Sequence, residues 1–378
     1  MLSSSPPFVD PASLATFLED KYINGYIKDG GAKFKLILGS EGCGKTAFLH
    51  RLGQSARIAN YAVATMSART TQLGRLDDFY RQVMSVLDLN ALIKLVSEHT
   101  VRSLGYDPME VGKSSFIVWA VTRGRSQPSI NRLVQEELEK LYHHGGLTPD
   151  FAAAVVSLTY RHLSGQKDET VDNISSWLKG LQTINYRILS GCGIHKRIDA
   201  YTARHALRSL LHLLRFVDIP GLVVLIDDLD RLMVTGKQTD GYMTYSRQKR
   251  GDTYESIRQF IDDGELMPGL FLICASRDTI AQDPKRGIPS YAALQNRLVD
   301  EVRANELNRF VDVLNLDRAW QLDWPRQRSA LIEAWSTVCR SQGRTPPSLS
   351  PDGFPYAGLV SPVRRIVDQF NLREGEIQ

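Results

Sequence analysis

The stretch from Gly39 to Thr46 carries residues that together can bind a triphosphate. It reads Gly-Ser-Glu-Gly-Cys-Gly-Lys-Thr and fits the pattern G-x-x-x-x-G-K-[ST], which chance would produce in roughly 1% of chains of this length. Glycines let the backbone wrap around phosphates, and the amide groups of such a loop point inward at the start of a helix. The stretch therefore predicts a phosphate loop, and the alternative is a fortuitous glycine-rich turn.

Each residue of this loop has an expected role. Lys45 is expected to reach the β- and γ-phosphates of ATP, and Thr46 is expected to ligate Mg²⁺. The residues expected to bind the nucleotide are Gly39, Ser40, Glu41, Gly42, Cys43, Gly44, Lys45, Thr46 and Ala47.

Two acids after an apolar run are the natural partner of such a loop. Leu222 to Ile226 is apolar throughout, which is typical of a buried strand in a parallel sheet. Asp227 and Asp228 follow it, at the carboxyl edge where open α/β sheets bind ligands. We expect Asp227 to hold Mg²⁺ through water and Asp228 to orient and polarise the attacking water. The alternative is that both acids cap the next helix.

A second apolar run, Leu270 to Ala275, predicts another polar strand end. Ser276 is the first candidate to touch the γ-phosphate and the attacking water, and Arg277 is the second. The alternative is an ordinary polar strand end. After the acid pair, Asp230 and Arg231 are expected to form a local ion pair rather than to act in catalysis.

An arginine, often one from a neighbouring subunit, can meet the charge that develops on the γ-phosphate. The candidates are Arg297 after the strand at 270–275, Arg247 and Arg250 in the loop after the acid pair, and Arg364 and Arg365 at the start of the last helix. If the arginine comes from a neighbour, the active species is a homo-oligomer. The alternative for each of them is a solvated surface arginine.

Two basic stretches are candidates for contact with nucleic acid. Residues 187–215 hold six Lys and Arg residues against one acid, and helical spacing would place the arginines beside a face of leucines. Residues 237–250 add Tyr242 and Tyr245, which could stack on bases. The residues expected to contact duplex DNA are Arg204, Arg208, Arg215, Lys249 and Arg250. The alternative is that both stretches are solvated surface.

The elements that position these residues alternate between strands and helices. Strands are expected at 33–38, 61–66, 222–226, 270–275 and 319–322, and helices at 13–28, from 47 onward, at 254–261, 328–339 and 362–370. Residues 75–215 are expected to be mainly helical, as a long insertion. The alternation indicates an α/β fold with a parallel sheet that has helices on both faces.

Composition excludes several classes of protein. The 378 residues are 43% hydrophobic and 23% charged, which is typical of a soluble globular protein and not of a disordered chain or a disulfide scaffold. A net charge of +4 permits nucleic-acid binding without arguing for it. The four cysteines lie far apart without metal spacing, which favours free thiols in a reducing cytoplasm. Neither a signal peptide nor a membrane span is expected.

The chain resembles the ATP-binding P-loop proteins of bacterial BREX (bacteriophage exclusion) systems. Besides the phosphate loop, the similar blocks are residues 27–35, 254–263, 268–271 and 286–298. The resemblance implies an AAA+-like P-loop ATPase that binds ATP and Mg²⁺, with a lead segment at 1–30, a core at 31–325 and a small helical lid at 326–378. It also implies a role in phage defence together with other components of the system. In such proteins an arginine near the start of the last lid helix senses the nucleotide, which here implies Arg364 or Arg365.

One departure from this family leaves other readings open. Asp228 stands where the family more often has Glu, and residues 226–231 are similar to the acid motif of the KAP P-loop NTPases, which rank second. We expect ATP hydrolysis coupled to conformational change, oligomer assembly and engagement of DNA or a partner. The shorter side chain of Asp228 favours an alternative, a nucleotide-gated binding module with little hydrolysis. A third reading is a signalling scaffold that binds only protein.

Overall fold

The computed structural model describes residues 8–112, 115–236, 239–262, 268–277, 279, 283–303, 307–349, 354 and 361–371, with the backbone alone for 299–303 and 371. The chain forms two compact units. The first comprises residues 1–74, 223–263 and 270–378, and the second comprises 75–222 and 264–269. The predicted boundaries of the core, the insertion and the lid stay a prediction.

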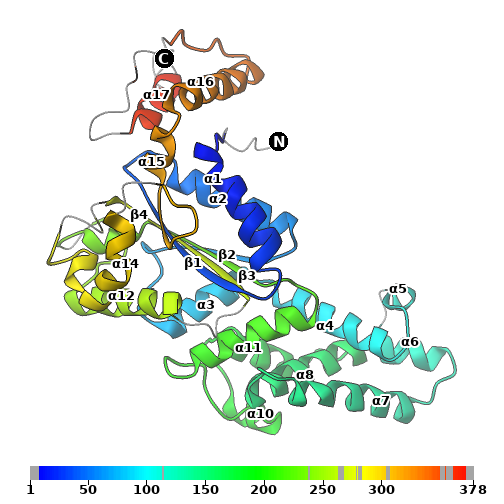
Figure 1. The fold of residues 1–378 in the computed structure, drawn as a ribbon. Coiled ribbons are helices and arrows are strands. Elements are labelled where there is room, and N and C mark those ends of the chain that lie inside the picture. Colours follow the sequence, from blue (N-terminus) through cyan, green and yellow to red (C-terminus); the bar gives the residue numbers. More distant parts are fainter. Residues whose placement is uncertain are drawn as a thin grey trace. The chain divides into compact units, whose positions relative to one another are not determined.

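The first unit is built on a five-stranded parallel sheet (Figure 1). Its strands are β1 (Ala32–Leu38), β2 (Ala62–Ser67), β3 (Leu222–Asp227), β4 (Gly269–Ala275) and β5 (Val313–Asn315), in the order β2-β3-β4-β1-β5. The four strands predicted at 33–38, 61–66, 222–226 and 270–275 are confirmed. The strand that carries the phosphate loop, β1, is therefore separated from the strand that carries the acids, β3, by β4 alone.

The fifth strand was predicted at the wrong place. Residues 319–322 lie in and just after helix α15 (Leu316–Gln321), while β5 is the three-residue segment before it. Asn315 begins the helix, because its side chain accepts the amide of Arg318 at 3.3 Å. Leu36 of β1 pairs with Val313 of β5, a strand too short for its apolar pattern to identify it.

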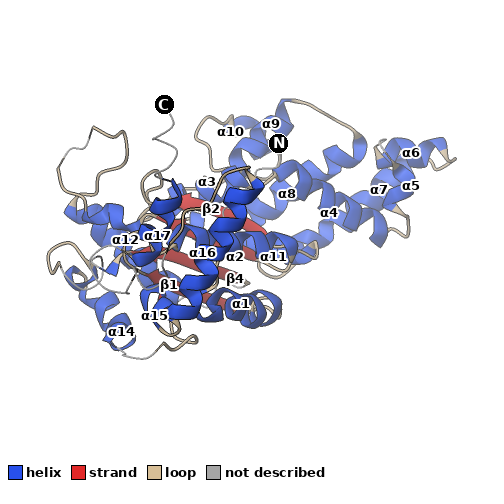
Figure 2. Ribbon diagram, turned by 90° about the horizontal axis from the view of Figure 1, so that it is seen from above, coloured by secondary structure: helices blue, strands red, loops and turns tan. Residues whose placement is uncertain are grey.

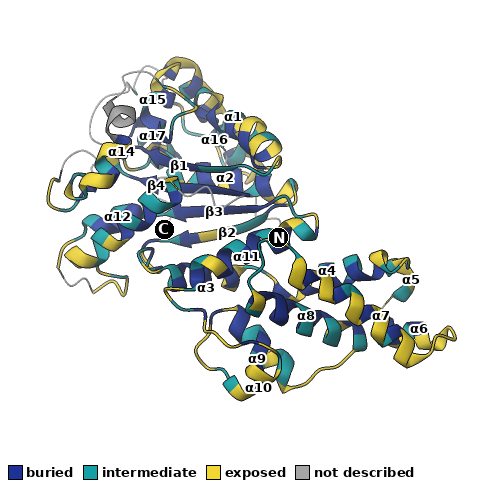
Figure 3. Ribbon diagram, turned by 60° about the horizontal axis from the view of Figure 1, so that its bottom comes forward, coloured by how far each residue is buried: buried dark blue, intermediate teal, exposed yellow. Residues whose placement is uncertain are grey.

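Alternate residues of the central strands face two different layers of helices. On one face, Val223 and Leu225 belong to a core shared with α1 (Leu14–Leu18), η2 (Glu19–Tyr26) and α2 (Lys45–Ile58). On the other face, Phe271 stacks on Phe260 of α12 (Arg247–Asp262), with ring centroids 5.3 Å apart. Figure 2 shows helices on both sides of the strands, and Figure 3 shows that the central strands β3 and β4 are buried. The predicted α/β fold is confirmed, because a parallel sheet carries helices on both of its faces.

The C-terminal part of the first unit is helical. It contains η5 (Ile288–Ser290), α14 (Ala292–Arg303), α15, α16 (Trp324–Ser341) and α17 (Pro362–Asn371). The helices predicted at 328–339 and 362–370 are confirmed. Trp335 and Phe370 join α16 to α17 with their ring centroids 6.0 Å apart, and the Arg344 side chain donates to the carbonyl of Phe370 at 2.8 Å.

The second unit is wholly helical over its described residues 75–112, 115–222 and 268–269, apart from the first residues of β3 and β4. Its helices are α3 (Leu76–Val86), α4 (Leu89–Ser103), α5 (Pro108–Val111), α6 (Phe116–Thr122), α7 (Gln127–Glu139), η3 (Lys140–His143), α8 (Pro149–Ser164), α9 (Glu169–Leu178), α10 (Tyr186–Gly191) and α11 (Ala203–Phe216). Several begin at capping side chains, such as Asp88, which accepts the amide of Ala91 at 3.0 Å. None of the described helices is long and apolar enough to cross a membrane.

A buried lysine holds the edge strand β5 in place. Lys35 of β1 is fully buried, and its ammonium group donates to the carbonyls of Arg309, Phe310 and Val311 at 3.1, 2.9 and 2.5 Å. The ammonium group also lies 4.8 Å from the centre of the Tyr22 ring. A buried charge is tolerated only when it is paired or hydrogen-bonded, so this cation and the three carbonyls depend on one another.

Replacing this lysine should destabilise the first unit. Lys35→Met leaves the carbonyls before β5 without their donor, and we expect it to lower the free energy of unfolding by about 2–4 kcal/mol, measured by urea denaturation. Lys33→Met, on the same strand, is the control. Lys33 is partly exposed and pairs at 2.5 Å with the buried Asp312, which keeps its ion pair with Arg297 when Lys33 is replaced, so the substitution should cost no more than about 1 kcal/mol. Equal effects of the two substitutions would contradict this account.

Candidate functional site

The predicted phosphate loop connects β1 to α2. Gly42 and Gly44 have φ values of 75° and 95°, the left-handed region that favours glycine. The ammonium group of Lys45 folds back onto the loop and donates to the carbonyls of Gly39 at 2.9 Å and Ser40 at 3.1 Å. The loop therefore holds its cation against its own backbone, at the start of a helix whose first amides can bind an anion.

A residue that sequence reasoning missed closes the loop from the other side. Asp317 of α15 is buried and accepts both the amide of Ser40 at 2.8 Å and its hydroxyl at 2.7 Å. Nothing in the spacing around Asp317 indicates this contact. It arises because β5 pairs with β1 and brings α15 next to the loop.

The two predicted Mg²⁺ ligands meet directly. The hydroxyl of Thr46 donates to Oδ2 of Asp227 at 2.6 Å, although the two residues lie on α2 and β3. Oδ1 of Asp227 accepts the amide of Asp228 at 2.8 Å. A hydroxyl and a carboxylate are the hard oxygen ligands that Mg²⁺ prefers, with phosphate and water as its other ligands. These residues therefore fit a Mg²⁺ ion bound together with a nucleotide.

Asp228 lies beside this pair and has partners that were not predicted. Its φ of 59° is uncommon for a residue other than glycine, and it begins the turn η4 (Leu229–Met233). One oxygen of its carboxylate accepts the hydroxyl of Ser67 at 2.7 Å, and the other lies 3.0 Å from the guanidinium of Arg69. Both partners lie at the end of β2. The rule that polar residues at the carboxyl ends of parallel strands gather could have identified them.

Ser276 lies at the same edge, held by Asp230. The amide of Ser276 donates to Asp230, and so does the hydroxyl of Thr279, at 2.8 Å. The predicted ion pair between Asp230 and Arg231 is wrong. Arg231 instead pairs with Asp240 through two hydrogen bonds of 2.7 and 2.9 Å, because neighbouring residues in a helical turn point in different directions.

The structure places the arginines that were candidates for contact with the nucleotide at different positions in the fold. Arg364 lies against the phosphate loop, since a Cβ added to Gly42 would fall 2.4 Å from the Cβ of Arg364. Its guanidinium is 3.7 Å from the carboxylate of Glu41. Arg365 follows it in α17 and is half-buried. Of the two arginines that were left open, the structure thus places Arg364 on the loop.

Arg297 lies at the opposite edge of the sheet. It pairs with Asp312 at 3.0 Å and with Asp262 at 3.4 Å. Asp312 precedes β5 and lies beside Lys35 of β1. Lys35 is four residues before Gly39, where the phosphate loop begins, which corresponds to about 13 Å along a strand. The structure does not bring Arg297 to the phosphate loop of its own chain.

The basic stretches are partly engaged within the protein. Arg250 donates to the carbonyl of Tyr245 at 2.7 Å. Tyr245 is buried with its hydroxyl bonded to the carbonyls of Ala68 and Thr71, so the prediction that it stacks on bases is wrong. Tyr242 is exposed, Lys249 is half-buried, and Lys237 lies outside the described residues.

On α11, the leucine face predicted beside the arginines is confirmed, because Leu207, Leu210, Leu211 and Leu214 are buried. Arg215 is exposed at the end of this helix, while Arg204 and Arg208 are half-buried.

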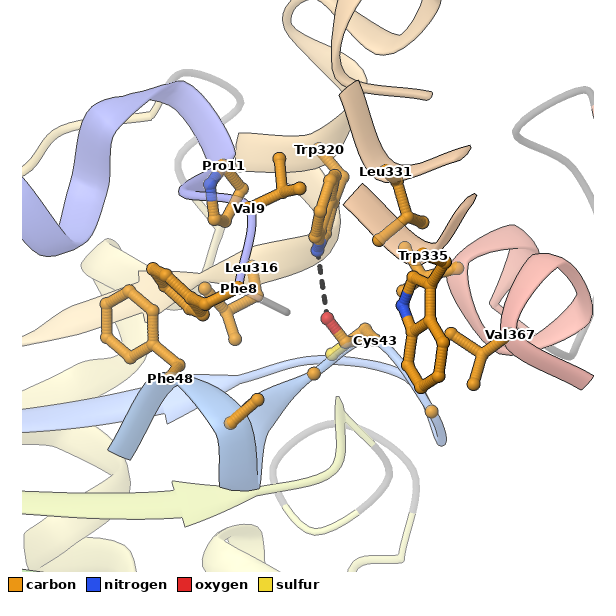
Figure 4. Close-up of a pocket in the computed structure, with 14 residues that line it drawn as sticks. Phe8, Val9, Pro11, Cys43, Phe48, Leu316, Trp320, Leu331, Trp335 and Val367 are labelled. Carbon is orange, nitrogen blue, oxygen red and sulfur yellow. Dashed lines mark hydrogen bonds between the residues drawn. The ribbon is translucent and has the colours of Figure 1, made fainter. Parts of the chain in front are cut away.

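An apolar pocket opens beside the phosphate loop. It encloses about 140 Å³ and is lined by the N-terminal residues Phe8 and Val9, by the loop and by helices α15, α16 and α17 (Figure 4). The indole of Trp320 lies over it and donates to the carbonyl of Cys43 at 2.9 Å. Burial raises the pKa of the Cys43 thiol to about 12, so this side chain stays neutral. An apolar pocket lined by aromatic side chains next to a phosphate loop suits a planar base.

A side chain at Gly42 should disrupt this site. In Gly42→Ala the added Cβ meets Arg364 and the backbone has positive φ, so we expect nucleotide affinity to fall at least 10-fold while the fold persists. A titration followed by the fluorescence of Trp320 and Trp335 measures this affinity. Gly251→Ala on α12 has open space around the added Cβ and serves as the control. An unchanged affinity in Gly42→Ala would contradict the assignment of the loop.

The chain matches the model of one known protein family over the region that contains these features. The model of the family described as BREX system ATP-binding protein BrxC/D matches residues 23–317. This range includes the phosphate loop, the acid pair and the end of β4. Searches of curated proteins and of solved structures found no match. The match spans most of the chain and confirms the resemblance seen in the sequence, and the chain therefore belongs to the family of ATP-binding proteins of the BREX phage-defence system.

Proposed function

We propose that this protein is an ATPase that couples ATP binding and hydrolysis to conformational change in a phage-defence system. The single observation that carries the proposal is the 2.6 Å contact between Thr46 and Asp227. It joins the phosphate loop to the acid strand at one edge of the sheet, with Asp228 beside them. A site that only binds a nucleotide would need the phosphate loop but not the second acid, Asp228.

The residues at this edge of the sheet have separate roles in hydrolysis. Lys45 binds the β- and γ-phosphates, and Asp228 orients the water that attacks the γ-phosphorus. The oxygen of this water forms the new bond to phosphorus, and the bond to the bridging oxygen breaks and leaves its electron pair on ADP. Ser276 contacts the γ-phosphate or the water. A Mg²⁺ ion held by Thr46 and Asp227 would supply charge neutralisation for the phosphates.

Arg364 is proposed to report the bound nucleotide to the lid. Its guanidinium is close to Glu41 of the loop and also lies 3.4 Å from Asp368 of its own helix. A nucleotide phosphate would compete for this guanidinium, so binding would change the contacts between α17 and the loop. The pocket lined by Trp320 and Trp335 would hold the base between the loop and the lid.

The remaining parts of the proposal concern partners. We propose a homo-oligomer in which Arg297 could serve a neighbouring copy, other components of the defence system as partners, and a cytoplasmic location. Duplex DNA is proposed to bind through Arg204, Arg208, Arg215, Lys249 and Arg250. The second candidate function is the nucleotide-gated module with little hydrolysis. It is favoured by the Asp228 carboxylate, since both of its oxygens have partners within the protein.

Asp228→Asn separates these two functions. If Asp228 orients the attacking water, the variant should bind ATP with affinity within about threefold of normal and release phosphate at least 100-fold more slowly. Lys45→Ala is the companion variant and should lose ATP binding as well, because the loop loses its cation. Normal phosphate release by Asp228→Asn would remove Asp228 from this role. Absence of release by the unaltered protein would favour the gated module.

The proposal that α11 binds duplex DNA is tested by measuring how the affinity for DNA depends on salt concentration. Arg204, Arg208 and Arg215 replaced together by Ala should reduce the slope of log affinity against log salt by about 2 to 3, because each phosphate contact adds close to one unit. The control removes the same charge elsewhere in the second unit, at Arg123, Arg125 and Arg132, which are exposed. An equal change of slope in both variants would show that the α11 arginines are only solvated.

A further inference from the structure

Arg69 is an arginine at the candidate site that none of the sequence motifs includes. It follows β2, and its guanidinium Nη2 lies 3.0 Å from Oδ1 of Asp228. Its side chain is 48% exposed, so it faces solvent as well as the acid. Its backbone carbonyl accepts the amide of Met243 at 2.9 Å. Both the backbone and the guanidinium of Arg69 therefore have partners within the protein, while part of the side chain remains accessible to solvent.

The ring of Tyr242 supports this guanidinium. Its centre lies 5.4 Å from Arg69 and 5.7 Å from Arg231, so two guanidinium groups lie within cation–π distance of this ring. The segment that carries Tyr242 is fixed at Asp240, which pairs with Arg231, and at the buried Tyr245, which bonds to the carbonyl of Ala68. The backbone on either side of Tyr242 is therefore attached to its surroundings, while the ring itself is partly exposed and lies beside the guanidinium of Arg69.

The guanidinium of Arg69 has hydrogen-bonding capacity to spare. Arginine offers five N–H donors in a planar fork. Within the described part of the chain, its only side-chain partners are the Asp228 carboxylate and the Tyr242 ring. A guanidinium that lies beside a ring and pairs with one acid still has donors to offer, in the planar geometry that matches phosphate oxygens.

The other candidate arginines lack this position. Arg297 lies at the far edge of the sheet with Asp312, and Arg250 donates to the carbonyl of Tyr245. Arg364 lies against Gly42, at the end of the loop that faces the lid. Only Arg69, of these four, is in contact with the acid assigned to the attacking water.

We propose that Arg69 is a catalytic residue that donates to the γ-phosphate from within the same chain, with Tyr242 as its positioning residue. This inference rests on the proposed ATPase function. During the step, the water oxygen bonds to the γ-phosphorus and the bond to the bridging oxygen breaks with its electron pair on ADP. Asp228 orients the water, whose proton leaves with the phosphate. Arg69 remains protonated throughout and stabilises the charge that spreads over the γ-phosphate oxygens.

The first test compares variants of Arg69 and Tyr242 in the full chain. Arg69→Ala should reduce phosphate release at saturating ATP about 100-fold or more, with ATP affinity within threefold of normal. Arg69→Lys should recover part of the rate, because a cation is restored without its planar fork. Tyr242→Phe should hydrolyse normally and Tyr242→Leu about 10-fold more slowly, since the ring acts and not the hydroxyl. Arg57→Ala, an exposed arginine on α2, is the control and should be unaffected.

The second test distinguishes action in the same chain from action on a neighbour. Arg69→Ala chains keep Lys45, and Lys45→Ala chains keep Arg69. A mixture of the two should hydrolyse no faster than the sum of its parts if Arg69 serves its own site. Recovery of turnover in the mixture would show that Arg69 serves a neighbouring copy and would overturn the inference, as would normal turnover of Arg69→Ala alone. No turnover by the unaltered protein would instead refute the proposed function itself.

Discussion

The parallel sheet is the constraint on which the rest of this structure depends. Its central strands are buried on both faces, so their polar residues can lie only at their ends. Because the strands are parallel, the carboxyl ends of β1, β2, β3 and β4 meet at one edge. The phosphate loop, the Ser67–Arg69 segment, the acid pair and Ser276 are each placed by the end of one strand. The contact between Thr46 and Asp227 is the direct evidence that these ends converge.

The polar groups at this edge of the sheet bond to one another. Lys45 bonds to the carbonyls of its own loop, Thr46 to Asp227, and Asp228 to Ser67 and Arg69. Buried or half-buried polar groups need such partners. In the proposed function, a nucleotide would exchange these bonds for its own, and this exchange would couple nucleotide binding to movement of the loop and the strand ends.

The same reasoning applies to the apolar side of the site. The apolar pocket is lined by the N-terminal residues, the phosphate loop and the C-terminal helices, which only the folded chain brings together. The hydrogen bond from Trp320 to Cys43 and the bonds from Ser40 to Asp317 attach α15 to the loop. These bonds are the contacts through which the proposed conformational change would pass from the loop to the helices that follow α15.

The sequence by itself determined the local features of this protein. The glycines of the phosphate loop, the apolar run before Asp227 and the similarity to a known family were sufficient for the α/β fold, four of the five strands and the family itself. These features are local because they depend on backbone conformation or on burial along one strand. The short strand β5 was missed, since three residues carry too little pattern.

Only the tertiary structure decided which distant side chains meet. It paired Arg231 with Asp240 and not with Asp230, buried Tyr245, placed Arg297 far from the phosphate loop and put Arg69 next to Asp228. Side chains of arginine and tyrosine are long, and their partners depend on which strands and loops become neighbours. Strand order fixes those neighbours, and strand order follows from the packing of the whole sheet rather than from any single segment.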